Sequence, residues 1–147
     1  MKIYMDVCCL CRPFDDDRQA RVRMEAEAVK IILSKIKVGE WSGVKSSITD
    51  YEISMNPDME KKIEVMLLAN GMDFNIVLSE ADRERGRELQ RLGYKGIDAM
   101  HIACAERAGA DVFLTTDDNI LKLVNRHGQV NLAVENPLRW LERILIK

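Results

Sequence analysis

Short apolar runs alternate with longer segments of helical periodicity through most of this 147-residue chain. The apolar runs are nearly continuous, which is typical of strands buried on both faces of a parallel sheet. Parallel neighbours require a crossover connection, usually a helix, so the alternation predicts an α/β fold with a parallel sheet between helices. We expect strands over residues 2–7, 74–78, 112–116 and 130–134.

Glycines, prolines and capping residues mark where the helices begin and end. Ser79 and Asp82 resemble a capping box with Asp in place of Glu or Gln, and Gly39 suits the end of the first long helix. Residues 12–17 are expected to form a loop. Helices are predicted over residues 22–36, 46–53, 57–70, 79–92, 96–108 and 119–126, with a last helix starting at residue 137.

Apolar residues at helical spacing indicate which helix faces are buried. The helix expected to start at Pro57 carries Met59, Ile63, Met66 and Leu67. A stripe buried in the core is the simpler interpretation, and an exposed surface for a protein partner is the alternative. Burial is also expected for three leucines of the terminal helix, Leu138, Leu141 and Leu145.

Length and composition narrow the class of protein. A chain that is 47% hydrophobic and 31% charged is expected to form one compact domain over residues 1–147. The formal net charge of -2 argues against a broad basic surface for nucleic acid, but it permits a phosphate to bind through a metal ion. No apolar run approaches the roughly 20 residues that span a bilayer, and Asp6 comes too early for a signal peptide. We therefore expect a cytoplasmic protein whose cysteines are reduced.

Four widely separated acids are the strongest indication of chemistry: Asp6, Glu52, Asp98 and Asp117. Each follows an expected strand or lies in the first turns of an expected helix, and in an open α/β sheet those positions meet at one edge. Carboxylates gathered without a counter-charge repel one another, so a divalent cation is the economical partner. Each acid alone also fits a structural role as a cap or a solvated side chain, and Asp118 is a second candidate for the place of Asp117.

Three segments carry a resemblance to a known family. They cover residues 3–6, residues 47–53 and residues 96–117, and the last runs from the helix that begins at Gly96 through Thr115 and Thr116 to Asp117. In order and spacing these segments resemble the PIN-domain nucleases, which include the toxin half of VapBC-type toxin–antitoxin pairs. The resemblance implies a PIN-like three-layer α/β/α sandwich whose central, mainly parallel sheet has four or five strands.

The same resemblance implies an activity and partners. It implies a Mg²⁺- or Mn²⁺-dependent endoribonuclease in which Asp6, Glu52, Asp98 and Asp117 hold the metal, and the metal activates a water for in-line attack on a phosphodiester. It implies RNA as the substrate, a cognate antitoxin as a partner, and products with a 5′-phosphate and a 3′-hydroxyl. A homodimer is a further option that the sequence leaves open.

Several residues near the acids are candidates for contact with the substrate. Arg12 is placed to hold a phosphate oxygen, and the hydroxyls of Thr115 and Thr116 stand directly before the fourth acid. Val7 departs from the family, whose members often carry Thr, Ser or Asn after the first acid, so some support for that acid is expected to be missing. The acids at residues 15–17 are expected to be solvated rather than part of the site.

Two other classes of function stay open. A catalytically silent relative would bind RNA or protein without cutting it, although such a protein would usually have lost one of the four acids. A thiol redox or metal-binding protein would use the C-x-x-C pair Cys8 and Cys11, but reduced thiols packed near the sheet are the preferred interpretation, because a redox role leaves the four acids unexplained. A zinc site would need a second pair where only Cys104 remains. His101 is interpreted as a core histidine with one hydrogen-bond partner, with a general base as the alternative.

Overall fold

The computed structural model describes residues 1–146, and its five strands form one sheet in the order β3-β2-β1-β4-β5. Every neighbouring pair of strands is parallel, as predicted. The first strand in the chain therefore lies at the centre of the sheet, between strands that come later. The strands are β1 (Lys2–Met5), β2 (Ser42–Ser46), β3 (Phe74–Ile76), β4 (Val112–Leu114) and β5 (Ala133–Glu135).

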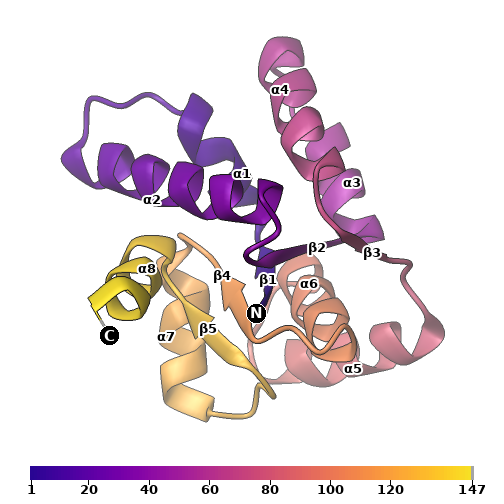
Figure 1. Ribbon diagram of the computed structural model, residues 1–147. Helices are drawn as coiled ribbons and strands as arrows, with labels where there is room; N and C mark the ends of the chain where they lie inside the picture. The colour runs from indigo at the N-terminus through magenta and orange to yellow at the C-terminus, as the bar shows by residue number, and fades with distance from the viewer. Residues whose placement is uncertain (147) are drawn as a thin grey trace.

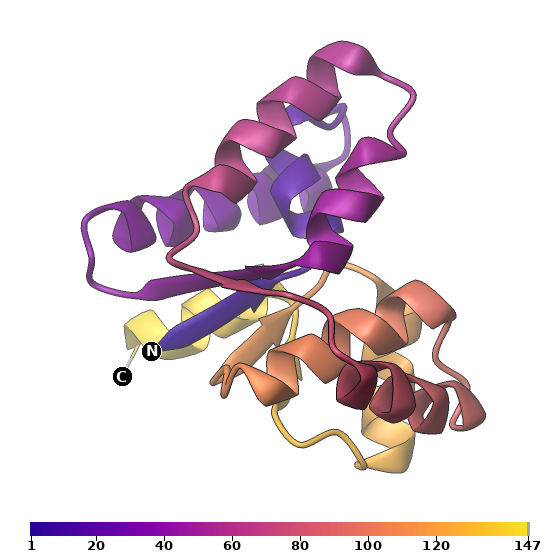
Figure 2. The ribbon, with the colours of Figure 1, turned by 90° about the vertical axis from the view of Figure 1, so that its right-hand side faces the viewer.

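Helices cover both faces of the sheet, which confirms the predicted three-layer sandwich (Figure 1, Figure 2). None of the described helices is both long and apolar enough to cross a membrane. Ser79 and Asp82 form the predicted capping box at the start of α5. The helices are α1 (Val7–Cys11), α2 (Ala20–Lys37), α3 (Ser47–Ser54), α4 (Met59–Asn70), α5 (Glu80–Arg91), α6 (Gly96–Arg107), α7 (Asp118–His127) and α8 (Pro137–Ile146), with a 3₁₀ turn, η1, at Arg12–Phe14.

The two faces of the sheet support separate hydrophobic cores. Side chains alternate along a strand, so Ile3 and Met5 of β1 face one core, together with residues of α1, α2, α4 and α8. Tyr4 faces the other core, where it packs with Phe113 of β4 and with residues of α5, α6 and α7. Between the two cores β1 and β4 are direct neighbours, with Met5 opposite Leu114, so the residues that follow the two strands start side by side.

The beginning of the chain differs from the prediction. β1 ends at Met5 rather than at Val7, because Asp6 accepts a hydrogen bond from the Val7 amide and acts as the N-cap of α1. The short helix α1 itself was not predicted from the sequence. Residues 12–17 are not a simple loop, since they begin with the 3₁₀ turn η1. The short helix therefore starts at the first of the four acids.

The strand β2 was missed, because its sequence contains two serines and a glycine and little β-branched character. Gly43 lies so close to α2 and to the segment after α4 that an added Cβ would meet Met72 Sδ at 2.3 Å and Ile36 at 3.2 Å. Close packing of the backbone against side chains explains both the glycine and the weak strand signal.

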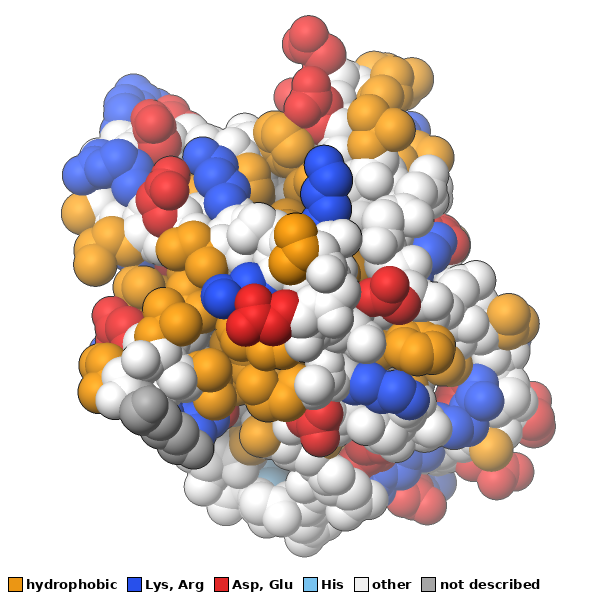
Figure 3. All heavy atoms as spheres, viewed as in Figure 1, with side chains coloured by type: hydrophobic (Ala, Val, Ile, Leu, Met, Phe, Trp, Pro, Cys, Tyr) orange, Lys and Arg blue, Asp and Glu red, His pale blue; other side chains and the backbone are white. Residues whose placement is uncertain are grey.

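The helix after Pro57 also differs from the prediction. α4 begins at Met59 with Asp58 as its N-cap, so Pro57 lies outside it. The prediction that the apolar stripe of this helix is buried is wrong, because the buried residues of α4 are Val65 and Ala69. Apolar side chains are exposed around α4 instead, at the top of Figure 3. In α8, Leu141 is buried as expected, but Leu145 is exposed. The exposed apolar side chains of α4 are Met59, Ile63, Met66 and Leu67.

Candidate metal centre

Asp6 lies at the carboxyl end of the central strand and is only 4% exposed. Its Oδ1 accepts the amide of Val7 at 2.8 Å. Its Oδ2 accepts the hydroxyl of Thr115 at 2.8 Å and the thiol of Cys8 at 3.4 Å. The side chain is thus fixed from both sides by donors, which is the arrangement expected for a carboxylate that must point in one direction.

Glu52 and His101 reach the same place from two different helices. Glu52, in α3, accepts a hydrogen bond of 2.7 Å at Oε1 from Nε2 of His101 in α6. The same His101 Nε2 lies 3.9 Å from Oδ1 of Asp6. One ligand atom from each of Asp6, Glu52 and His101 lies within 4.8 Å of the others, so these three residues form a group that is compact enough for a metal ion.

Asp98, in the first turn of α6, is electrostatically coupled to this group. Burial, and after it the charges of the nearby Asp6 and Asp117 carboxylates, raise its pKa to about 6, while His101 acts in the opposite direction. Burial likewise raises the pKa of Asp6. Mutual repulsion among partly buried acids is the condition that a divalent cation relieves, and the oxygen-rich donor set suits a hard cation such as Mg²⁺ or Mn²⁺.

The raised pKa of Asp98 predicts how stability depends on pH without metal. Because the folded protein binds this proton more tightly than the unfolded chain does, the free energy of unfolding falls as pH rises from about 4 to about 6. Asp98→Asn should remove this loss. In the presence of a chelator, urea unfolding at pH 7 should show the variant to be about 1–2 kcal/mol more stable, after solvent screening is allowed for. The advantage should shrink toward pH 4.5, and an equal difference at both pH values would contradict the coupling.

Asp117 and Asp118 have different roles in the structure, although they are neighbours. Asp117 is the N-cap of α7, with Oδ1 accepting the amide of Asn119 at 2.8 Å, and it is close enough to Asp98 to raise the pKa of that residue. Asp118 forms a bidentate pair with Arg21 at 2.8 and 2.9 Å. The geometry therefore favours Asp117 as the fourth acid, because the carboxylate of Asp118 is already neutralised.

The predicted contact residues Thr115 and Thr116 are both buried. Thr115 is fully enclosed, and its hydroxyl donates to Asp6 and accepts the amide of Asp117 at 3.1 Å. The hydroxyl therefore holds the carboxylate of Asp6 and the backbone of Asp117, and it is enclosed instead of being exposed to a substrate. Thr115 also supplies a hydroxyl to Asp6, so the presence of Val7 after the first acid leaves that acid supported from another strand end.

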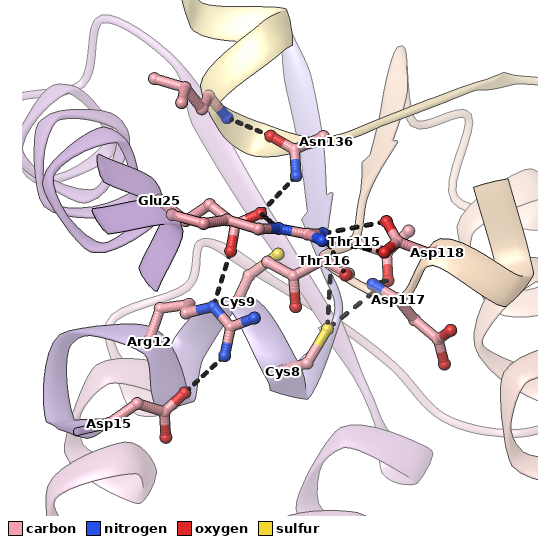
Figure 4. A network of polar contacts seen from close by, with 12 residues as sticks. Cys8, Cys9, Arg12, Asp15, Glu25, Thr115, Thr116, Asp117, Asp118 and Asn136 are labelled. Carbon is pink, nitrogen blue, oxygen red and sulfur yellow. Dashed lines mark hydrogen bonds and ion pairs between the residues drawn. The ribbon is translucent and has the colours of Figure 1, made fainter. Parts of the chain in front are cut away.

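Arg12 does not lie beside the acids as a free guanidinium. Its Nε donates to Glu25 at 2.9 Å and its NH1 donates to Asp15 at 2.8 Å (Figure 4). Asp15 also pairs with Lys61 and is therefore not simply solvated, which corrects the expectation for this residue. The guanidinium is thus committed to a structural network rather than presented to a phosphate.

Glu25 is the centre of this network and was not identified from the sequence. It is 1% exposed and accepts hydrogen bonds from Arg12, from Arg21 at 3.2 Å and from Asn136 at 2.5 Å. Figure 4 shows Arg12 and Asn136 meeting it from two other parts of the chain, while Arg21 lies one turn earlier on the same helix. A glutamate in a helix with charged neighbours gives no sign of burial, so only its long-range partners reveal its role.

The cysteines remain thiols near the sheet. All four are free, and Cys8 accepts the amide of Thr116 at 3.3 Å in addition to its contact with Asp6. No disulfide joins Cys8 and Cys11 in the described residues, and Cys8 contributes to the support of the first acid. His101 has two hydrogen-bond partners rather than the expected one, since Tyr4 meets its Nδ1 at 2.6 Å.

Comparisons with known proteins place this geometry in context. Residues 3–125 match the family described as the PIN domain. The fold is similar to FitAcB from Neisseria gonorrhoeae, with a TM-score of 0.57 and 15% identity over 92% of this chain and 97% of that chain. It is also similar to VapBC2 from Rickettsia felis bound to a DNA fragment from their promoter, with a TM-score of 0.60 and 15% identity over 92% and 98%. No curated protein matches the sequence.

Proposed function

Since this chain belongs to the PIN-domain family, we propose that it is a Mg²⁺- or Mn²⁺-dependent endoribonuclease and the toxin component of a type II toxin–antitoxin pair. The observation that carries the proposal is the group of partly buried acids at the carboxyl edge of the sheet, in which Asp98 has a pKa of about 6 because of burial and of its acidic neighbours. Acids that repel one another in a fixed arrangement are suited to a divalent cation.

In this proposal Asp6, Glu52, Asp98 and Asp117 hold the cation. When bound, the cation would activate a water and stabilise the negative charge that builds on the phosphate. Asp6 is held in one orientation by Thr115 and by the Val7 amide, so its carboxylate needs little rearrangement on binding. The low net charge of the chain is consistent with recognition of the phosphate through the metal rather than through a basic surface.

The toxin assignment has separate support. One of the solved structures with a similar fold is a VapBC pair, the type of pair that the sequence resembles. The antitoxin partner, a homodimer and a cytoplasmic location belong to the proposal. A catalytically silent relative is the second candidate, and the presence of all four acids argues against it.

RNA cleavage tests the activity directly. Single-stranded RNA incubated with the protein should be cut in Mg²⁺ or Mn²⁺ and left intact in EDTA, and the products should carry 5′-phosphates. Cleavage that is equal in EDTA would exclude a metal-dependent mechanism. RNA that binds the protein in a metal-dependent manner but is not cleaved would favour the silent relative.

Metal binding makes an independent prediction. A cation that binds only the folded state stabilises it by about 2.7 kcal/mol at 100 times its Kd, which corresponds to a rise in Tm of about 5–10 °C for a chain of this size. Mn²⁺ at millimolar concentration should therefore raise the Tm of the wild-type protein and leave that of Asp6→Asn nearly unchanged. A wild-type Tm that does not move would show that the acids are not a metal site.

A further inference from the structure

We propose that Tyr4 and His101 are positioning residues that form a buried hydrogen-bond relay and fix the orientation of the Glu52 carboxylate. The inference rests on the proposed function, because it assigns these residues a purpose within the same site. The starting observation is that Glu52 is the most exposed member of the compact group, with a side chain that is 34% exposed, whereas His101 beneath it is fully buried.

The relay begins inside the sheet. The hydroxyl of Tyr4 lies 2.6 Å from Oγ of Ser46, 3.3 Å from Oγ1 of Thr49 and 2.6 Å from Nδ1 of His101. The opposite ring nitrogen of His101, Nε2, lies 2.7 Å from Oε1 of Glu52. A continuous chain of short contacts therefore runs from the centre of the sheet to the acid.

Counting donors and acceptors determines the direction of the chain. A carboxylate only accepts hydrogen bonds, so Nε2 of His101 carries a hydrogen and donates it to Glu52. In a neutral ring Nδ1 is then an acceptor, and the Tyr4 hydroxyl must donate to it. Burial raises the pKa of Tyr4, so its hydroxyl retains the hydrogen that this bond needs. The Ser46 oxygen accepts the amide of Ile48 at 3.2 Å, which leaves the hydrogen of the Ser46 hydroxyl available for donation to the Tyr4 oxygen.

This direction changes the role of His101. With a hydrogen on Nε2, the ring has no lone pair to offer a cation at that atom, so the compact group of Asp6, Glu52 and His101 consists of two candidate ligands and one donor. The donor uses Oε1 of Glu52 and leaves Oε2 without a hydrogen-bond partner among residues 1–146. His101 thus selects which oxygen of Glu52 faces a cation.

The rings themselves are held in place by packing. Tyr4 stacks on Phe113 with ring centroids 5.3 Å apart, and His101 meets the edge of Tyr4 at 5.6 Å. All three side chains are fully buried. Since neither ring can rotate without disturbing the core, the hydrogen that His101 presents to Glu52 has a fixed direction.

The test is Tyr4→Phe, which keeps the ring and removes only the hydroxyl. We expect the rate constant of RNA cleavage, kcat, and the affinity for Mn²⁺ each to fall about 10- to 100-fold with KM for RNA little changed, as for other groups that orient a metal ligand. ¹⁵N NMR of the His101 ring should show hydrogen on Nε2 alone in the wild-type protein and a mixture of tautomers in the variant. Tyr94→Phe is the matched control, because the Tyr94 hydroxyl is buried without a hydrogen-bond partner in the described chain, and this variant should behave like wild type.

A second pair of variants keeps the test informative if Tyr4→Phe unfolds. The amide nitrogen of Gln can take the place of Nε2, so His101→Gln should retain more activity than His101→Leu. Equal cleavage and equal Mn²⁺ affinity for Tyr4→Phe and wild type, equal activity of the two His101 variants, or a wild-type ring without hydrogen on Nε2 or with hydrogen on both nitrogens would overturn the relay. A wild-type protein that cuts no RNA would instead refute the proposed function, and the NMR signal, which needs neither RNA nor metal, would still decide on the relay.

Discussion

Replacing Asp6 with asparagine is expected to lower the rate of RNA cleavage by more than about 100-fold. Changes in groups that merely support a metal ligand already cost about 10- to 100-fold, and Asp6 is the proposed ligand on which the surrounding contacts converge. Its carboxylate accepts hydrogen bonds from Val7, Cys8 and Thr115. The neutral amide of asparagine keeps this shape and removes the charge.

The same substitution should leave the fold intact or more stable. Asp6 is buried, and its pKa is raised chiefly by burial and also by the charge of Glu52, so its ionised form weakens the metal-free protein near neutral pH. Asparagine removes that cost while its oxygen still accepts the Val7 amide. Circular dichroism and Tm in EDTA measure the fold, and an RNA cleavage assay in Mn²⁺ measures the activity. Retained cleavage in a folded Asp6→Asn protein would refute the assignment.

Asp118→Asn is the control for this experiment. Asp118 is exposed and paired with Arg21, so its loss should leave cleavage within about twofold of wild type. Asp117→Asn should resemble Asp6→Asn. If the two neighbouring variants behaved in the opposite way, Asp118 would be the fourth acid.

Replacing Glu25 with alanine is expected to destabilise the protein by about 3–5 kcal/mol, the usual cost of removing one partner of a buried ion pair. The glutamate is fully buried and accepts hydrogen bonds from Arg12, Arg21 and Asn136. Without it the half-buried guanidinium of Arg12 loses one of its two carboxylates, and the donor group of Asn136 loses its acceptor. Urea unfolding measures the free energy, and Tm should fall by roughly 10 °C or more.

Glu27→Ala provides the comparison on the same helix. Glu27 is exposed and forms a surface pair with Lys30 at 3.2 Å, so its removal should change the free energy of unfolding by less than about 0.5 kcal/mol. The two substitutions are chemically identical and differ in burial. A loss below about 1 kcal/mol for Glu25→Ala would show that the network contributes little to stability.

Features that depend on local sequence were predictable. Alternating apolar runs and helical periodicity indicated the parallel sheet, and the capping box of Ser79 and Asp82 marked the start of α5. Asp98 is electrostatically coupled to Asp6, Glu52 and Asp117, as expected for positions after parallel strands and in the first turns of helices, which converge at one edge of the sheet. Their roles as metal ligands stay predictions.

Features that depend on distant contacts were not predictable. The burial of Glu25 and the second partner of His101 arise from residues far along the chain. Arg12 was expected near a phosphate, but it pairs with acids that the loop and α2 bring to it. The exposure of Ile63 on α4 shows the same limit, since helical spacing identifies a stripe but not what covers it.

The central position of β1 has a consequence for synthesis on the ribosome. This strand is made first, yet the hydroxyl that holds Asp6 belongs to Thr115, which is 109 residues later. The ring that meets Tyr4 belongs to His101, which is 97 residues later. A nascent chain therefore carries its first acid long before the partners that orient it exist. If the protein is a nuclease toxin, growing chains are harmless to the RNA around them, and activity begins only after β4 has emerged and joined the sheet.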